Sequence, residues 1–120
     1  MNSLKDIDKK IQELKQDSEN SLIVVEGIKD KSALNNLGID NIITLKGPLY
    51  EEIEKISEKT KEVILLVDLD KEGKKLYHAL KIGLESKGVK INDKFRNFLF
   101  KTNLRNIEGL VTYYPKLILA

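Results

Sequence analysis

The stretch VILLVDLDKEG (residues 63–73) decides the fold of this chain of 120 residues. It opens with an unbroken run of leucine and β-branched side chains at 63–67, which is typical of a strand covered on both faces in a parallel sheet. Acidic residues follow at once, and behind them Leu76, Leu80 and Leu84 recur at helical spacing. The stretch therefore predicts a buried strand, a turn that carries carboxylates, and a helix.

An earlier part of the chain has the same order, with the apolar run LIVV (residues 22–25) followed by EGIKD (residues 26–30). Periodicity and turn signals predict further helices near 3–17, after Asp30, after Gly47-Pro48 and at 72–87, 93–101 and 107–114, and strands at 41–45 and 89–91. Strands and helices thus alternate after a leading helix. This pattern predicts an α/β fold, a four-stranded parallel sheet with helices on both faces and strand order 2-1-3-4.

One domain is expected, because a chain of 120 residues is long enough for a single core. Within it we expect a leading helix at 1–18, a core at 20–100 and a C-terminal helical extension at 101–120. The apolar runs of about five residues are far shorter than the roughly 20 residues that span a bilayer, and the first residues lack the apolar core of a signal peptide. We therefore expect a cytoplasmic protein with no membrane partner.

The composition excludes several kinds of site. The chain has no cysteine, which excludes disulfides, thiolate zinc sites and cysteine nucleophiles. The net charge of +2 is close to neutral, so it neither requires nor forbids binding to a nucleic acid. Aromatic residues make up 6% of the chain and tryptophan is absent, which gives little support to a platform that stacks single-stranded bases.

The acidic residues after the two apolar runs predict a metal site. Glu26 comes one residue after the first strand and Asp68 one residue after the third, and neighbouring strands lie about 4.8 Å apart. Asp68 and Asp70 are two residues apart, so in an extended segment both side chains point the same way. Carboxylates gathered at one edge repel one another unless a cation lies between them. All-oxygen ligands suit Mg²⁺ or Mn²⁺, with Glu26 as a ligand or as a general acid or base.

Other residues near this edge suit a phosphate group. Lys29, Lys71 and Lys74 follow the acidic residues and are candidates for contacts with phosphate oxygens. Gly27 and Gly73 permit tight turns and a close approach of the backbone to a ligand. The ordinary alternative is that the lysines lie on solvated helix faces and that the acidic residues cap the helices that follow, as we expect of Asp30.

A second basic group, formed by Lys94, Arg96, Lys101 and Arg105, is a candidate for contact with a nucleic-acid backbone. The same side chains could equally lie on solvated helix faces. The chain has one histidine, His78, about eight residues beyond Asp70 and so roughly 12 Å further along a helix. We therefore do not expect His78 to be a metal ligand.

At these residues the chain resembles the Toprim domain family, whose signature is a glutamate after the first strand and Asp-x-Asp after the third. The run that leads into EGIKD (residues 26–30) resembles the first motif, and VDLDKEG (residues 67–73) resembles the second. The resemblance covers about residues 20–100, and it is strongest to small stand-alone Toprim proteins, many of them archaeal. IEGL (residues 107–110), which contains Glu108, is similar to an element near the end of those proteins and of ribosomal-RNA maturation nucleases.

The resemblance implies that Asp68 and Asp70 bind Mg²⁺ and that Glu26 is the general acid or base and a further ligand. It also implies work on phosphodiester bonds of RNA or DNA, as in the topoisomerases, primases and nucleases of the family. The chain lacks the other parts of several members: a nucleophilic tyrosine on a winged helix, a cysteine zinc module and the P-loop of an attached ATPase.

Three functions stay open at this point. The first is a small Mg²⁺-dependent nuclease, a hydrolase of phosphodiester bonds. The second is a subunit that binds nucleic acid through the same metal without catalysis, together with a protein partner. The third is a phosphate-accepting receiver domain, which also has acidic residues after its first and third strands. The receiver is disfavoured, because it requires an acidic pair near Glu26 and a lysine after a fifth strand.

Overall fold

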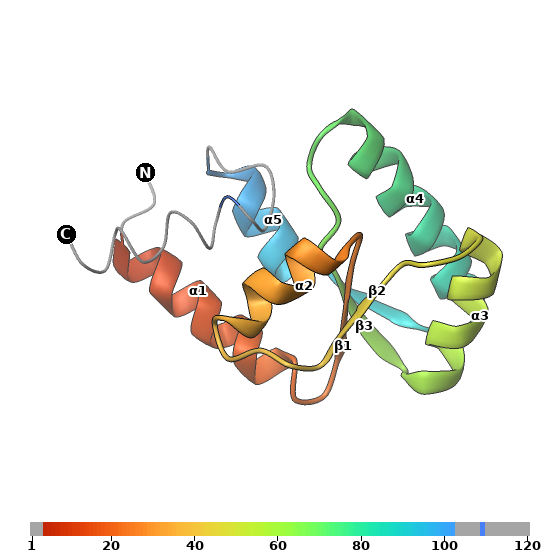
Figure 1. Ribbon diagram of the computed structural model, residues 1–120, viewed down its shortest axis with the longest axis horizontal. Coiled ribbons are helices and arrows are strands. Elements are labelled where there is room, and N and C mark those ends of the chain that lie inside the picture. Colours follow the sequence, from red (N-terminus) through yellow and green to blue (C-terminus); the bar gives the residue numbers. More distant parts are fainter. Residues whose placement is uncertain (1–3, 103–108, 110–120) are drawn as a thin grey trace.

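The computed structural model describes residues 4–102 and residue 109. Within this part of the chain, five helices surround a four-stranded sheet (Figure 1). The helices are α1 (Leu4–Asp17), α2 (Ile28–Asn35), α3 (Leu49–Lys59), α4 (Lys71–Ser86) and α5 (Lys94–Phe100). The strands are β1 (Leu22–Val25), β2 (Ile42–Thr44), β3 (Glu62–Leu65) and β4 (Lys90–Asn92).

The sheet is parallel throughout and has the order β2-β1-β3-β4, which confirms the predicted order. Ile23 of β1 lies opposite Ile42 of β2 on one side and Ile64 of β3 on the other. The last bridge between β1 and β3 pairs Val24 with Leu65, and it is completed by the N–H of Leu66, which donates to the carbonyl of Val24 at 2.9 Å. The chain therefore leaves β1 and β3 at nearly the same level, on the carboxyl edge of the sheet.

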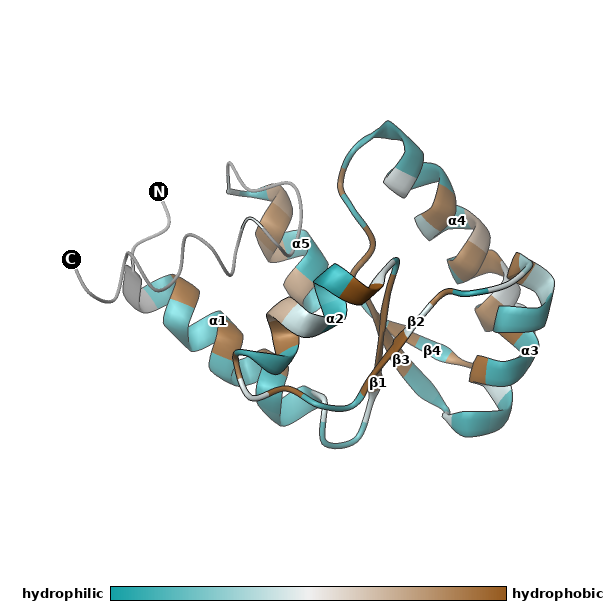
Figure 2. Cartoon of the chain, viewed as in Figure 1, coloured by the Kyte–Doolittle hydropathy of each residue, from teal (hydrophilic) through white to brown (hydrophobic). Residues whose placement is uncertain are grey.

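Two apolar layers lie on the two faces of the sheet, as expected for strands that are buried on both sides. One layer joins Ile23, Val25 and Ile64 to α1, α2 and α5. The other joins Val24, Val63 and Leu65 to α3 and α4. Figure 2 shows β1 as hydrophobic, β4 as mostly hydrophilic, and the helices as a mixture of hydrophobic and hydrophilic residues. No helix in the described ranges is long and apolar enough to cross a membrane.

Most predicted elements match those observed within one or two residues. The helix predicted at 93–101 is observed as α5 (Lys94–Phe100). The prediction that Asp30 caps α2 was wrong in detail. Gly27 occupies the cap position, and Asp30 lies three residues further on, where its carboxylate accepts from the backbone N–H of Gly27 at 3.3 Å. The predicted helix at 107–114 falls outside the described residues, apart from residue 109.

Candidate functional site

A direct hydrogen bond joins the two acidic motifs across neighbouring strands. Oε1 of Glu26, at the end of β1, accepts from the backbone N–H of Asp68, after β3, at 2.9 Å. Both side chains are half-buried. The parallel pairing of β1 with β3 brings these residues together although they are 42 positions apart in the chain. Glu26 therefore lies at the same edge of the sheet as Asp68 and Asp70.

The loop between β3 and α4 alternates between solvent and core. Leu69 is 3% exposed and belongs to the apolar layer of α1, α2 and α5, whereas Asp68 is half-buried and Asp70 is exposed. Oδ1 of Asp70 accepts from the backbone N–H of Gly73 at 2.7 Å, so Asp70 caps the first turn of α4. The buried leucine thus anchors the loop, and the capping bond sets where the helix begins.

The donor set suits a hard divalent cation, because it consists of carboxylate oxygens that solvent can reach. Mg²⁺ commonly binds through one or two protein carboxylates and keeps several waters. The described residues contain no group of three or more acidic, histidine or cysteine side chains gathered closely enough to hold an ion together. The hydrogen bonds place Glu26 against the backbone of Asp68, whereas one carboxylate oxygen of Asp70 is engaged at the start of α4.

The two glycines that flank this edge differ in their surroundings. A Cβ atom placed on Gly73 would overlap the carbonyl group of Asp68 and lie 2.6 Å from its carbon atom. At Gly27 the backbone is extended, with φ −144°, and apart from its neighbours in the chain no described atom lies within 4 Å of an added Cβ. Gly73 thus permits the close approach of α4 to the acidic loop, whereas position 27 has room for a side chain.

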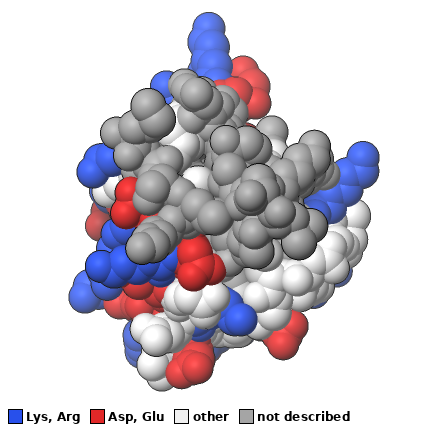
Figure 3. Space-filling model, turned by 90° about the vertical axis from the view of Figure 1, so that its left-hand side faces the viewer, with Lys and Arg blue, Asp and Glu red and all other residues white. Residues whose placement is uncertain are grey.

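The candidate phosphate ligands Lys29, Lys71 and Lys74 are exposed and lie in the first turns of α2 and α4. Nζ of Lys74 lies 5.5 Å from the centre of the Phe100 ring. On the side of the molecule that carries α1 and α5, basic and acidic side chains are interspersed around the undescribed residues (Figure 3). The described side chains of that face thus form no broad field of one sign.

The structure also contains a buried polar cluster between α4 and α5 that sequence reasoning missed. Arg96 was assigned to an exposed basic group, but it is 5% exposed and its guanidinium stacks on Tyr77, 3.8 Å from the ring centre. The Tyr77 hydroxyl donates to Asp93 at 2.5 Å. Burial raises the pKa of Tyr77, and Asp93 raises it further, whereas burial lowers the pKa of Arg96. Single-chain periodicity gives no sign that these residues meet.

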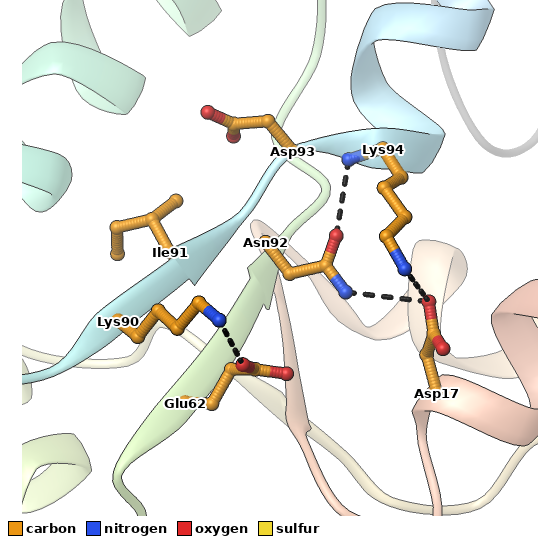
Figure 4. A pocket seen from close by; sticks show the side chains of 7 residues that line it. All are labelled: Asp17, Glu62, Lys90, Ile91, Asn92, Asp93 and Lys94. Carbon is orange, nitrogen blue, oxygen red and sulfur yellow. Dashed lines mark hydrogen bonds and ion pairs between the residues drawn. The ribbon is translucent and has the colours of Figure 1, made fainter.

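A separate hollow of about 230 Å³ runs along β4 (Figure 4). It is lined by Asp17, Glu62, Lys90, Ile91, Asn92, Asp93 and Lys94. Its lysines are paired: Nζ of Lys90 lies 3.7 Å from Glu62, and Nζ of Lys94 lies 3.9 Å from Asp17. Asn92 also donates to Asp17 at 3.3 Å. Of the candidate residues only Lys94, from the second basic group, lines this hollow, and it is paired with Asp17. We therefore assign the hollow no part in the site at the acidic edge.

Comparisons with known proteins agree with this architecture. The Toprim domain family matches residues 20–93. A UPF0292 protein of Methanocaldococcus jannaschii is 38% identical over 112 residues, which cover 88% of each chain. The solved structure of a protein from Aquifex aeolicus has a TM-score of 0.80 and 39% identity, over 85% of this chain and 95% of that one.

A larger enzyme is similar to this chain in its fold alone. The crystal structure of the zinc-binding and RNA polymerase domains of the Aquifex aeolicus primase has a TM-score of 0.57 and 24% identity. That match covers 91% of this chain but only 27% of the primase chain. The family match includes both acidic motifs, since residues 26–30 and 67–73 lie within it. The chain therefore belongs to the Toprim domain family.

Proposed function

We propose that this protein is a small nuclease that hydrolyses phosphodiester bonds of RNA or DNA with bound Mg²⁺ or Mn²⁺. The observation that carries the proposal is the hydrogen bond from the Asp68 backbone to Glu26. It holds the glutamate of the first motif against the Asp-x-Asp of the second, at the edge where parallel α/β sheets bind ligands. Membership in the Toprim family supports phosphodiester chemistry at this edge.

Each acidic residue has a role in this proposal. Asp68 and Asp70 would hold the ion, and the ion would supply positive charge next to the phosphodiester. Glu26 is fixed through Oε1, and its Oε2 has no hydrogen-bond donor among the described residues, so that oxygen is the one that carries a proton. Glu26 takes a proton from the attacking water as the water oxygen bonds to phosphorus. The bond from phosphorus to the leaving oxygen breaks, and that oxygen receives the proton.

A second candidate is a binding subunit that grips nucleic acid through the same metal without cleaving it. The engagement of Asp70 in the cap of α4 favours this alternative, because it leaves fewer free carboxylate oxygens for catalysis. A binding subunit would need a protein partner that supplies the missing groups. The two candidates predict the same metal ligands but differ in turnover.

The test incubates pure protein with end-labelled single- and double-stranded RNA and DNA, with Mg²⁺ or Mn²⁺. Glu26→Gln removes the proton carrier while keeping its size, and we expect cleavage to fall by about 10²-fold or more. Glu58→Gln on the exposed end of α3 is the matched control and should cleave like the wild type. Full cleavage by Glu26→Gln would refute the catalytic role. Metal-dependent binding with no turnover on any substrate would select the binding subunit.

A further inference from the structure

Arg96 is held between two aromatic rings at the junction of α4 and α5. Its guanidinium carbon lies 3.8 Å from the centre of the Tyr77 ring and 4.9 Å from that of Phe100. Stacking of this kind stabilises a guanidinium and fixes the plane in which its N–H groups lie. Arg96 is therefore a rigid donor, although nearly all of its surface is buried.

This donor lacks acceptors on one side. Nε and Nη2 of Arg96 are both buried and have no hydrogen-bond partner in the described chain. These two nitrogens lie on the same side of the guanidinium, so together they form a fork that fits two oxygens of one anion. Leaving such groups unpaired is costly, and an unpaired buried donor in a native protein calls for a missing ligand or water.

Asp93 does not fill the fork. Its Oδ2 accepts from the Tyr77 hydroxyl at 2.5 Å and lies 3.8 Å from Nζ of Lys81. Its Oδ1 is itself buried without a partner among the described residues. The carboxylate thus bonds to Tyr77 and pairs with Lys81. Its charge partly offsets the lowering of the Arg96 pKa by burial, but neither of its oxygens hydrogen-bonds to Nε or Nη2.

We propose that Arg96 binds a phosphate group of the nucleic acid, with Nε and Nη2 donating to two of its oxygens; this inference rests on the proposed function. The proposed function makes phosphate the anion to test first. Lys74 lies one helical turn beyond Asp70 and approaches to 5.5 Å the same Phe100 ring that lies beside the guanidinium, so this ring and lysine connect Arg96 to the start of α4. Phe100, which lies beside the guanidinium at the end of α5, is 40% exposed, so the cluster meets solvent at this ring.

The phosphate could be the terminal group of a strand or a diester within it, and one binding experiment distinguishes these sources. The probes are single-stranded oligonucleotides of one sequence with a 5′-phosphate, a 3′-phosphate or hydroxyls at both ends, in EDTA so that cleavage cannot occur. Arg96→Lys keeps the charge but loses the fork. We expect it to bind about ten- to a hundredfold more weakly, the size of one bidentate charge-assisted contact.

The pattern across the probes identifies the source. A loss confined to one phosphorylated probe assigns the fork to a strand end, and an equal loss on all three assigns it to a diester. Lys90→Gln, which removes an exposed charge on β4, is the control and should change binding by less than about threefold. If Arg96→Lys binds every probe as the wild type does, the proposal is overturned.

A second measurement covers the case in which Arg96→Lys fails to fold. Inorganic phosphate is titrated into the wild-type protein while the Nε–H resonance of Arg96 is followed by NMR. A saturable shift supports the fork, and a resonance unmoved at tens of millimolar phosphate overturns it. Glu26→Gln should show the same phosphate-dependent shift of the Arg96 resonance as the wild type. Failure of the nuclease proposal and failure of the Arg96 proposal therefore give different results.

Discussion

At Gly73, a hydrogen atom in place of a methyl group lets α4 begin against the carbonyl of Asp68. The added carbon of Gly73→Ala would meet backbone, which cannot turn away as the end of a side chain can. The loop that carries Asp68 and Asp70 must then shift. We expect a loss of about 1–3 kcal/mol in the free energy of unfolding, measured in urea, because overpacking in a tight site costs this much.

Gly27→Ser is the matched control for this prediction. Position 27 is the cap of α2, its backbone is extended, and no described atom would crowd a new Cβ. Serine is a preferred cap residue, so we expect stability to stay the same or rise slightly. Equal destabilisation by both substitutions would show that the close approach at Gly73 is not the cause.

Asp70 serves both the cap of α4 and the proposed metal site, and two substitutions separate these roles. Asparagine caps a helix about as well as aspartate, whereas alanine costs about 1 kcal/mol. We therefore expect Asp70→Asn to keep wild-type stability without metal while its Mg²⁺ affinity, measured by calorimetry, falls at least about tenfold. Asp70→Ala should lose both. Unchanged Mg²⁺ affinity in Asp70→Asn would limit Asp70 to a structural role.

Individual residues show where sequence reasoning reaches its limit. The position of Glu26 beside Asp68 follows from two apolar runs that end in acidic residues, because parallel strands place such ends on one edge. The burial of Arg96 could not be predicted in this way. It depends on rings supplied by two helices, and the helical spacing of a charged residue does not reveal what packs over it.

At the scale of the elements, the contact between α4 and α5 should make the folded state less stable at alkaline pH. Burial and Asp93 raise the pKa of Tyr77 above its ordinary value of about 10 in the unfolded chain. The unfolded state therefore loses this proton first, and the folded state loses stability as the pH rises above about 10. The expected slope is about 1.4 kcal/mol per pH unit, until the pH reaches the raised pKa of the folded state.

Tyr77→Phe tests this expectation in denaturant titrations between pH 9 and 11. The variant should be less stable than the wild type near pH 9, because Asp93 loses its donor. Above pH 10 its free energy of unfolding should fall less steeply with pH, and the difference in slope should equal the contribution of Tyr77. The slope and not the starting value is the measurement that matters. A slope equal to that of the wild type would assign the alkaline loss to other groups.

The elements also show which patterns are informative. An unbroken apolar run identified β1 and β3 because a strand buried on both faces has no polar side. The ends of the strands did not follow from these runs. Strand β3 ends at Leu65, where its pairing with β1 stops, although the apolar run continues to Val67. For α2, the choice of Gly27 over Asp30 as the cap depends on the exit of the chain from β1, which spacing alone does not give.

For the whole molecule, a bound ion should stabilise the fold. Any ligand that binds only the native state adds about 2.7 kcal/mol at a concentration 100 times its Kd. If Glu26, Asp68 and Asp70 bind Mg²⁺, the melting temperature of the wild type rises with Mg²⁺ concentration. Asp68→Asn should lose most of this rise, and Glu58→Gln should keep it. A rise that is equal in all three proteins would place the ion elsewhere.

The order of the sheet was predicted from the expectation that the acidic ends of strands one and three meet, which requires these two strands to be neighbours, as they are. The packing of α1 and α5 on the same face was not predictable. Their apolar stripes are compatible with either face, and the choice is made by the other residues of the layer that they join.

The contacts that hold the loop between β3 and α4 predict how the protein responds to a high salt concentration. Leu69 lies in the core, Gly73 touches the backbone of Asp68, and the Asp68 N–H donates to Glu26. Salt screens attraction between charges in solvent but does not weaken apolar burial or steric contact. If the protein binds a nucleic acid as proposed, potassium chloride near molar strength should weaken that binding while the acidic edge retains its shape, so that desalting alone restores it.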